Sequence, residues 1–175
     1  PGTADPQAVL AAIDAAINTG TTTGPAVDRA IALLDRWDTP SAIRARRSRA
    51  AELATTSPDR AEAIYRELLA FPASHLPDRD IVTLDLAALL LRQGQLADAF
   101  GLAMPIAQLQ MTPTDALGWR AWTLALEAIG KASPANAETR SIARAHLLRL
   151  RSADPTLGGG PWADRLASVE RALAP

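Results

Sequence analysis

The chain has 175 residues, with 18 basic and 19 acidic side chains and therefore a formal net charge of −1. This near balance disfavours a strongly basic nucleic-acid binder. The chain contains no cysteine and two histidines, which excludes disulfides, thiolate metal sites and thiol nucleophiles and argues against a histidine-rich metal site. Hydrophobic residues make up 48% of the sequence, enough for one domain, residues 1–175, with a sizeable core.

Helix start signals recur along the chain as a short polar residue followed by proline. Proline suits the first turn of a helix because the amide hydrogen that it lacks would have no partner there. Such pairs are Asp5-Pro6, Thr39-Pro40, Ser57-Pro58 and Ser133-Pro134. Between them apolar residues recur at three- and four-residue spacing, which is typical of helices. The sequence therefore predicts an all-α chain with helices at 6–18, 25–37, 41–55, 58–71, 79–93, 95–110, 114–130, 135–152 and 162–174.

Short linkers and a repeated pattern indicate that these helices pair into hairpins. The turn at Gly94 and the break from Thr56 to Pro58 leave too few residues for anything but antiparallel neighbours. The second helix of each hairpin carries a small residue, a second residue four positions later and an apolar one three further on. These sets are Ala30, Leu34, Trp37; Ala61, Tyr65, Leu68; Ala99, Ala103, Ile106; and Ala143, Leu147, Leu150. One hairpin cannot bury its apolar face alone, so we expect the hairpins to stack.

Two segments carry a family resemblance. Residues 86–99, LAALLLRQGQLADA, and residues 119–130 with the later Asp154-Pro155 resemble the tetratricopeptide repeat family in its first helix, turn glycine, small residue and terminal proline. The resemblance is best over residues 58–155. It implies an α-α superhelix of about eight to nine helices in stacked antiparallel hairpins, with residues 161–174 as a C-terminal capping helix. Gly130 and Ala143 would then bracket an insertion relative to the family's 34-residue period.

The resemblance also implies a function: a non-catalytic protein-interaction or scaffold module that binds a peptide or helix in its concave groove. The predicted groove residues are Ile81, Leu84, Ala88, Leu91, Arg92, Leu117, Arg120, Leu124 and Glu127. Because this face is largely aliphatic, we expect a partner segment, the remainder of a parent protein or a second copy to cover it. Arg92 and Arg120 would orient the bound segment by pairing with its carboxylates.

Two alternative functions remain open at this point. The densest charge cluster, Arg44 to Arg49 with four arginines, suggests binding of nucleic acid or an acidic ligand. On a helix these arginines spread over a wide arc, which favours a solvated face paired with Glu52 and nearby aspartates. The other alternative is a purely architectural self-assembly domain.

The remaining motifs favour structural interpretations. Trp119 and Trp122 lie on adjacent turns, where aromatic rings could stack on a ligand, but the tetratricopeptide resemblance implies that both pack within the core. Three consecutive glycines, Gly158 to Gly160, lack the lysine of a phosphate-binding loop and indicate a turn. His75 and His146 have no accompanying nucleophile elbow or carboxylate pair. The sequence therefore predicts no enzyme activity, no catalytic residue, no metal ligand and no cofactor.

The sequence gives only a broad expectation of location. The longest apolar run, Leu86 to Leu91, ends at Arg92, far short of the roughly 20 residues that span a bilayer. The chain begins at Pro1 without methionine and is rich in alanine and arginine. We expect a soluble cytoplasmic or periplasmic domain of a larger bacterial protein.

Overall fold

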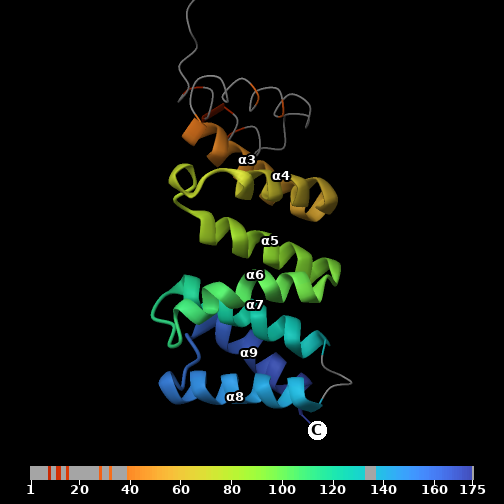
Figure 1. Cartoon of the computed structure of the whole chain (residues 1–175), viewed down its shortest axis with the longest axis vertical. Coiled ribbons are helices and arrows are strands. Elements are labelled where there is room, and N and C mark those ends of the chain that lie inside the picture. The colour runs from red at the N-terminus through yellow and green to blue at the C-terminus, as the bar shows by residue number, and fades with distance from the viewer. Residues whose placement is uncertain are drawn as a thin grey trace, which may run out of the picture. The chain divides into compact units, whose positions relative to one another are not determined.

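The computed structural model describes residues 39–132 and 137–174, together with Ala8, Ala11, Ala12, Ala15, Asp28 and Ala32. These residues form seven α-helices, one short 3-10 helix and no strand (Figure 1). The helices are α3 (Thr39–Thr56), α4 (Pro58–Ala70), α5 (Arg79–Gln93), α6 (Leu96–Leu109), α7 (Ala116–Ala132), α8 (Ala137–Ala153) and α9 (Gly160–Ala172), and η1 is Ala73–His75. The all-α prediction is confirmed. The count is slightly lower than predicted, since the helices expected at 6–18 and 25–37 lie outside the described residues except for the six isolated positions.

The predicted start signals and turns fix the ends of several helices. Ser57 alone separates α3 from α4, and Pro58 occupies the first turn of α4 as expected. At the end of α5, Gly94 has a φ of +80°. The backbone N–H groups of Gly94 and Gln95 donate to the carbonyls of Leu91 and Leu90, at 3.4 and 2.9 Å. This is the Schellman arrangement, in which glycine adopts a left-handed conformation without the steric cost of a side chain.

The side chain of Asp115 caps the start of α7. The backbone N–H of Gly118 donates to Asp115 Oδ1 at 2.8 Å, which satisfies one of the unpaired amides of the first turn. This bond and a second from the Gln110 side chain hold the pKa of Asp115 below its ordinary value of 3.8. The carboxylate is therefore charged at neutral pH, as the positive end of the helix favours.

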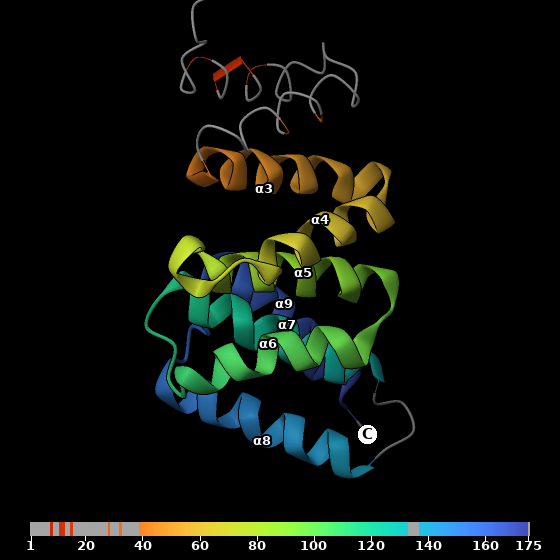
Figure 2. The same ribbon diagram turned by 45° about the horizontal axis from the view of Figure 1, so that its top comes forward.

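The chain divides into two compact units, Pro1–Val82 and Thr83–Pro175, with the division inside α5. In unit 1, α3 packs against α4. In unit 2, α7 is the central helix and packs against α6, α8 and α9 (Figure 2). Trp119 and Trp122 on α7 are both buried, which confirms their predicted place in the core.

The turn between α8 and α9 is built around Asp154. Its carboxylate accepts hydrogen bonds from the backbone N–H groups of Thr156 and Gly158, at 2.8 and 2.9 Å, and from the Thr156 hydroxyl at 2.6 Å. Gly158 has a φ of +78°, and a Cβ built there would lie 2.6 Å from the Trp119 ring. The expected glycine turn therefore forms, and Gly158 also provides the close approach that Trp119 needs.

Candidate functional site

The nine residues predicted to line a groove differ in their exposure. Leu84, Leu91 and Leu124 are buried, so in this structure they do not offer their side chains to a partner. For α7 the reason is that α6, α8 and α9 pack against it, and buried residues occupy nearly its whole circumference. Of the remaining six, Arg92 is exposed, and the half-buried residues are Ile81, Ala88, Leu117, Arg120 and Glu127. The groove as a whole stays a prediction.

Two charged residues of the predicted groove, Arg120 and Glu127, form ion pairs within unit 2. Arg120 Nη2 lies 2.7 Å from Asp85 Oδ1, which links α7 to α5. Glu127 accepts two hydrogen bonds from the Arg165 guanidinium, at 2.7 and 2.6 Å, which links α7 to α9. Such two-bond pairs are geometrically specific. Arg120 and Glu127 therefore join helices of the chain itself.

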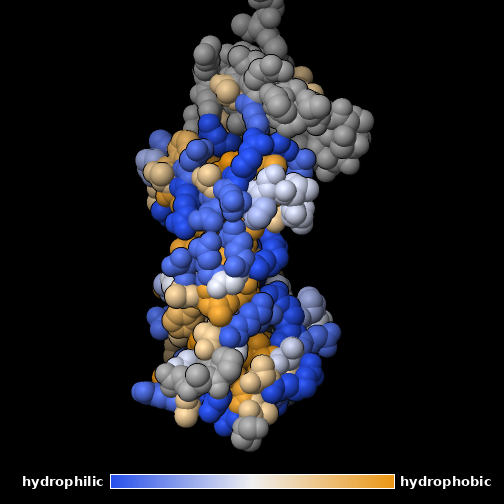
Figure 3. Space-filling model, turned by 90° about the vertical axis from the view of Figure 1, so that its right-hand side faces the viewer, coloured by the Kyte–Doolittle hydropathy of each residue, from blue (hydrophilic) through white to orange (hydrophobic). Residues whose placement is uncertain are grey.

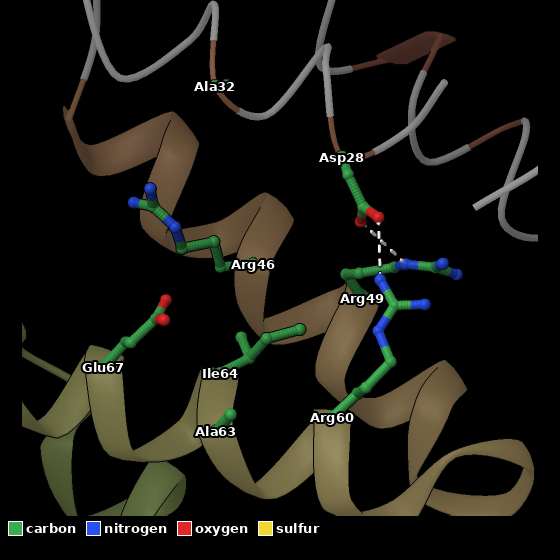
Figure 4. Close-up of a pocket in the computed structure, with 8 residues that line it drawn as sticks. All are labelled: Asp28, Ala32, Arg46, Arg49, Arg60, Ala63, Ile64 and Glu67. Atoms are coloured by element: carbon green, nitrogen blue, oxygen red, sulfur yellow. Dashed lines mark hydrogen bonds and ion pairs between the residues drawn. The ribbon is translucent and has the colours of Figure 1, made fainter. Parts of the chain in front are cut away.

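The Arg44 to Arg49 cluster on α3 does not form one basic surface. Arg49 is 4% exposed; its Nε donates to Asp28 Oδ1 at 3.3 Å, and its guanidinium also pairs with Glu52, as predicted. Arg60 of α4 reaches the other oxygen of Asp28 at 2.9 Å, so that two arginines converge on one carboxylate (Figure 4). Arg49 is therefore a buried ion-pairing residue and is not available for a nucleic-acid phosphate.

Exposed hydrophobic side chains gather instead on unit 2. Four large hydrophobic residues among those the structure describes are at least half exposed: Leu109 at 81%, Leu148 at 68%, Met111 at 53% and Ile142 at 50%. Figure 3 shows hydrophobic patches that interrupt the hydrophilic surface at the level of α8. Monomeric proteins rarely expose large contiguous apolar areas unless they bind something there.

The two segments that carry these residues meet at the ring of Trp122. The indole N–H of Trp122 donates to the carbonyl of Gln110, between Leu109 and Met111, at 2.8 Å. From α8, the His146 ring lies 5.0 Å from the Trp122 ring, and the Arg149 guanidinium lies over it at 5.0 Å. Trp122 thus holds the turn at 109–111 beside α8.

Charge at this junction is mainly positive. Nε and Nη2 of Arg149 are buried and have no hydrogen-bond partner, so the Trp122 π-face is their principal stabilising contact. Burial, and to a lesser extent the charge of Arg149, lowers the pKa of His146 below its ordinary value of 6.5. The imidazole is therefore neutral at pH 7, and the positive charge of this junction comes from Arg149.

The described part of the chain offers no group of three or more His, Asp or Glu side chains arranged to hold a metal ion. Each helix within the described ranges is too short or too polar to cross a membrane. Comparison with protein-family models, curated proteins and solved structures finds no match. The tetratricopeptide resemblance therefore stays a prediction.

The exposed residues of α8 are functional candidates that the sequence interpretation missed. Ile142, Ala145 and Leu148 are spaced three residues apart on the side of the helix opposite the buried Leu147 and Ala143. A single buried stripe should leave polar residues on that side. The large aliphatic residues Ile142 and Leu148 lie outside this stripe, and in the sequence they were the signal that could have indicated an exposed apolar surface.

Proposed function

We propose that this chain is a non-catalytic protein-interaction module whose binding surface is the outer face of α8 together with the adjoining turn. We call this surface the α8 patch and define it as Leu109, Met111, Ile142, Ala145 and Leu148. The observation that carries the proposal is that all four exposed large hydrophobic residues of the described chain belong to these two segments, which Trp122 holds together. The proposal keeps the function expected from the sequence and moves the surface from the inner faces of α5 and α7 to α8.

The partner that fits this surface is an amphipathic helix with acidic flanks. The three-residue spacing of Ile142, Ala145 and Leu148 gives an inclined apolar ridge along α8, which suits packing against a second helix. The same helix carries four arginines and one glutamate; Arg144 and Arg151 are exposed, and Arg151 also donates two hydrogen bonds to Glu170 of α9, each of 2.9 Å. Acidic residues beside the partner's apolar stripe would complement this charge and fix the orientation of the helix.

We further propose that the helices stack as a tetratricopeptide-like solenoid. Support comes from the single-residue link between α3 and α4, the tight Gly94 turn, and the contacts of α7 with α6, α8 and α9. The Arg120–Asp85 pair adds a contact between the first helices of consecutive predicted hairpins. In this arrangement α9 takes the role of the capping helix expected at residues 161–174, and α8 keeps one side exposed.

Fluorescence polarisation with two labelled helical peptides tests the proposed surface. Both peptides carry the same leucine stripe, flanked by glutamates in one and by lysines in the other. We expect the acidic peptide to bind the wild-type chain, and Leu148→Asp to weaken binding by about tenfold, the effect of losing a central apolar contact. Ser152→Asp adds the same charge to the exposed side of α8 without removing an apolar side chain, and it should change binding less than threefold.

Two results would contradict the proposal. If the acidic and basic peptides bound with equal affinity, the partner would not be recognised by its charge. If Leu148→Asp and Ser152→Asp lost affinity equally, the apolar side chain of Leu148 would not contribute to binding. Light scattering addresses the second-copy alternative, because a dimer that forms with rising concentration and is lost in Leu148→Asp would assign the patch to self-association.

A further inference from the structure

A small pocket in unit 1 lies between the start of α3 and the segment that runs from η1 into α5. Its volume is about 260 Å³. Ile43, Leu76 and Val82 line it and are all buried, so the interior is apolar. Pro40 and Pro77 also line the pocket, and their fixed backbone angles stiffen the wall.

The frame of the pocket is held by a contact between α4 and α5. Arg79, the first residue of α5, donates through its guanidinium to the carbonyls of Phe71 and Leu69 at 3.1 and 2.8 Å. These carbonyls lie at the C-terminal end of α4, where backbone carbonyls have no hydrogen-bond donor within the helix. The contact closes the segment between α4 and α5 into a loop, so the wall that this loop provides is formed before any ligand arrives.

The mouth of the pocket is positively charged. Arg44 and Arg47 carry this charge, His75 also lines the mouth, and among the described lining residues the one carboxylate is Asp78, whose Oδ2 lies 3.7 Å from Arg47 Nη1. Two helices also begin here, since Pro40 lies in the first turn of α3 and Asp78 directly precedes α5. Figures 1 and 2 show both helices starting on the side where η1 lies. Helix N-termini carry partial positive charge, so helix ends and side chains favour an anion together.

We propose that this pocket binds a small organic carboxylate with a compact aliphatic or aromatic body. The apolar interior takes the body of the ligand, and the Arg44 and Arg47 guanidiniums bind the carboxylate at the mouth. At roughly 30 Å³ for each water-sized group, the volume accommodates about nine non-hydrogen atoms. The pocket uses no residue of the α8 patch, and its test is independent of the proposed function.

Three probes separate the two parts of this recognition. Hexanoate carries both a charge and an apolar body, hexanol has the body alone, and inorganic phosphate has the charge alone. In methyl NMR titrations we expect hexanoate to shift the resonances of Ile43, Leu76 and Val82, and to bind at least about tenfold more tightly than either other probe. Equal affinity of hexanoate and hexanol, or of hexanoate and phosphate, would overturn the proposal, as would shifts confined to methyl groups elsewhere.

Charge variants test the assigned mouth. Arg44→Gln and Arg47→Gln should each weaken hexanoate binding about fivefold, the upper range for a solvent-accessible ion pair. Arg66→Gln is the matched control, since Arg66 is an exposed arginine of α4 that pairs with Glu62 at 2.8 Å and does not line the pocket. Circular dichroism checks that each variant is folded. An equal loss of affinity in Arg66→Gln and Arg47→Gln would reduce the effect to net charge and overturn the assignment.

Discussion

Units 1 and 2 each contain an arginine-rich helix, and they use these arginines in different ways. α3 and α8 both carry four arginines. In unit 1, Arg49 is buried among carboxylates that come from α3 itself and from Asp28. In unit 2, Arg149 lies over the Trp122 ring, and two of its nitrogens have no hydrogen-bond partner. The same sequence feature thus has two roles, and neighbours far along the chain decide which one applies.

Both units have buried apolar residues and ion pairs between helices, but each also has a contact of its own. In unit 1 two arginines converge on Asp28, whereas in unit 2 the buried Trp119 ring packs against the backbone of Gly158. Ion pairs tolerate small shifts because long side chains adjust, but a ring packed against backbone does not. We therefore expect unit 2 to respond most to changes of shape and unit 1 to changes of charge.

The largest effect should come from Gly158→Ala in unit 2. The new Cβ would overlap the Trp119 ring at 2.6 Å, and the φ of +78° is strained for alanine. We expect a loss of about 3 kcal/mol in the free energy of unfolding, measured by urea titration with tryptophan fluorescence.

Gly159→Ala separates backbone strain from overlap. Gly159 has a similar φ of +67°, but a Cβ there would meet nothing within 4 Å. We expect this variant to lose about 2 kcal/mol, from strain alone, because a φ of +67° combined with a ψ of −178° is a conformation that essentially only glycine adopts. If both variants lost the same amount, the close approach of Gly158 to Trp119 would not be what stabilises unit 2.

The next effect compares the buried Arg49 with the half-buried Arg149. Arg49→Met removes the bonds to Asp28 and Glu52 and should cost about 2 kcal/mol, moderated because both carboxylates are partly exposed to water. Arg149→Met replaces an unpartnered guanidinium with a side chain that also packs well on Trp122, so its stability should stay within about 1 kcal/mol of wild type. Urea titrations of both variants give these differences.

The salt dependence of the free energy of unfolding is the control for the comparison of Arg49→Met with Arg149→Met. Raising the salt concentration should reduce the cost of Arg49→Met because ions screen the pairs that it removes, and it should leave Arg149→Met nearly unchanged. If Arg149→Met were the more destabilising variant, the proposed contrast between the two units would be wrong.

Much of the fold could be predicted because it depends on local signals. The bounds of the helices from α3 to α9 lie within two residues of those expected, since proline, glycine and apolar spacing act over a few residues. The burial of Trp119 and Trp122 was expected from the tetratricopeptide resemblance, and both are buried. Local patterns therefore identified the helices and much of the core.

The candidate sites could not be predicted to the same extent, because they depend on contacts distant in sequence. Arg49 pairs with Asp28, 21 residues away, and no local pattern links these two positions. Leu124 was expected to face a groove, but α7 is covered by three helices. The α8 patch needs the turn beside Gln110, which is held by a hydrogen bond from Trp122, the residue whose ring also contacts α8. Helical periodicity gives the faces of a helix without saying which neighbours cover them.

The smallest expected effect is the loss of stability in acid at the turn between α8 and α9, which contains the charged side chain of Asp154. Hydrogen bonds from Thr156 and Gly158 hold the pKa of Asp154 below its ordinary value of 3.8. A carboxyl whose pKa is lower in the folded state stabilises that state above pH 3.8, and this contribution is lost as the pH falls through the folded-state pKa. Urea midpoints of wild type and Asp154→Asn should therefore differ at pH 7 and converge toward pH 3.

Asp164→Asn removes the same charge at an exposed position on α9, away from the turn, and is the matched control for Asp154→Asn. Asp115, whose pKa is also lowered, is unchanged in both variants and accounts for acid sensitivity that they share with wild type. A constant difference between wild type and Asp154→Asn from pH 7 to pH 3 would mean that the charge of Asp154 does not stabilise the turn. The turn between α8 and α9 would then depend on the close approach of Gly158 to Trp119 rather than on the charge of Asp154.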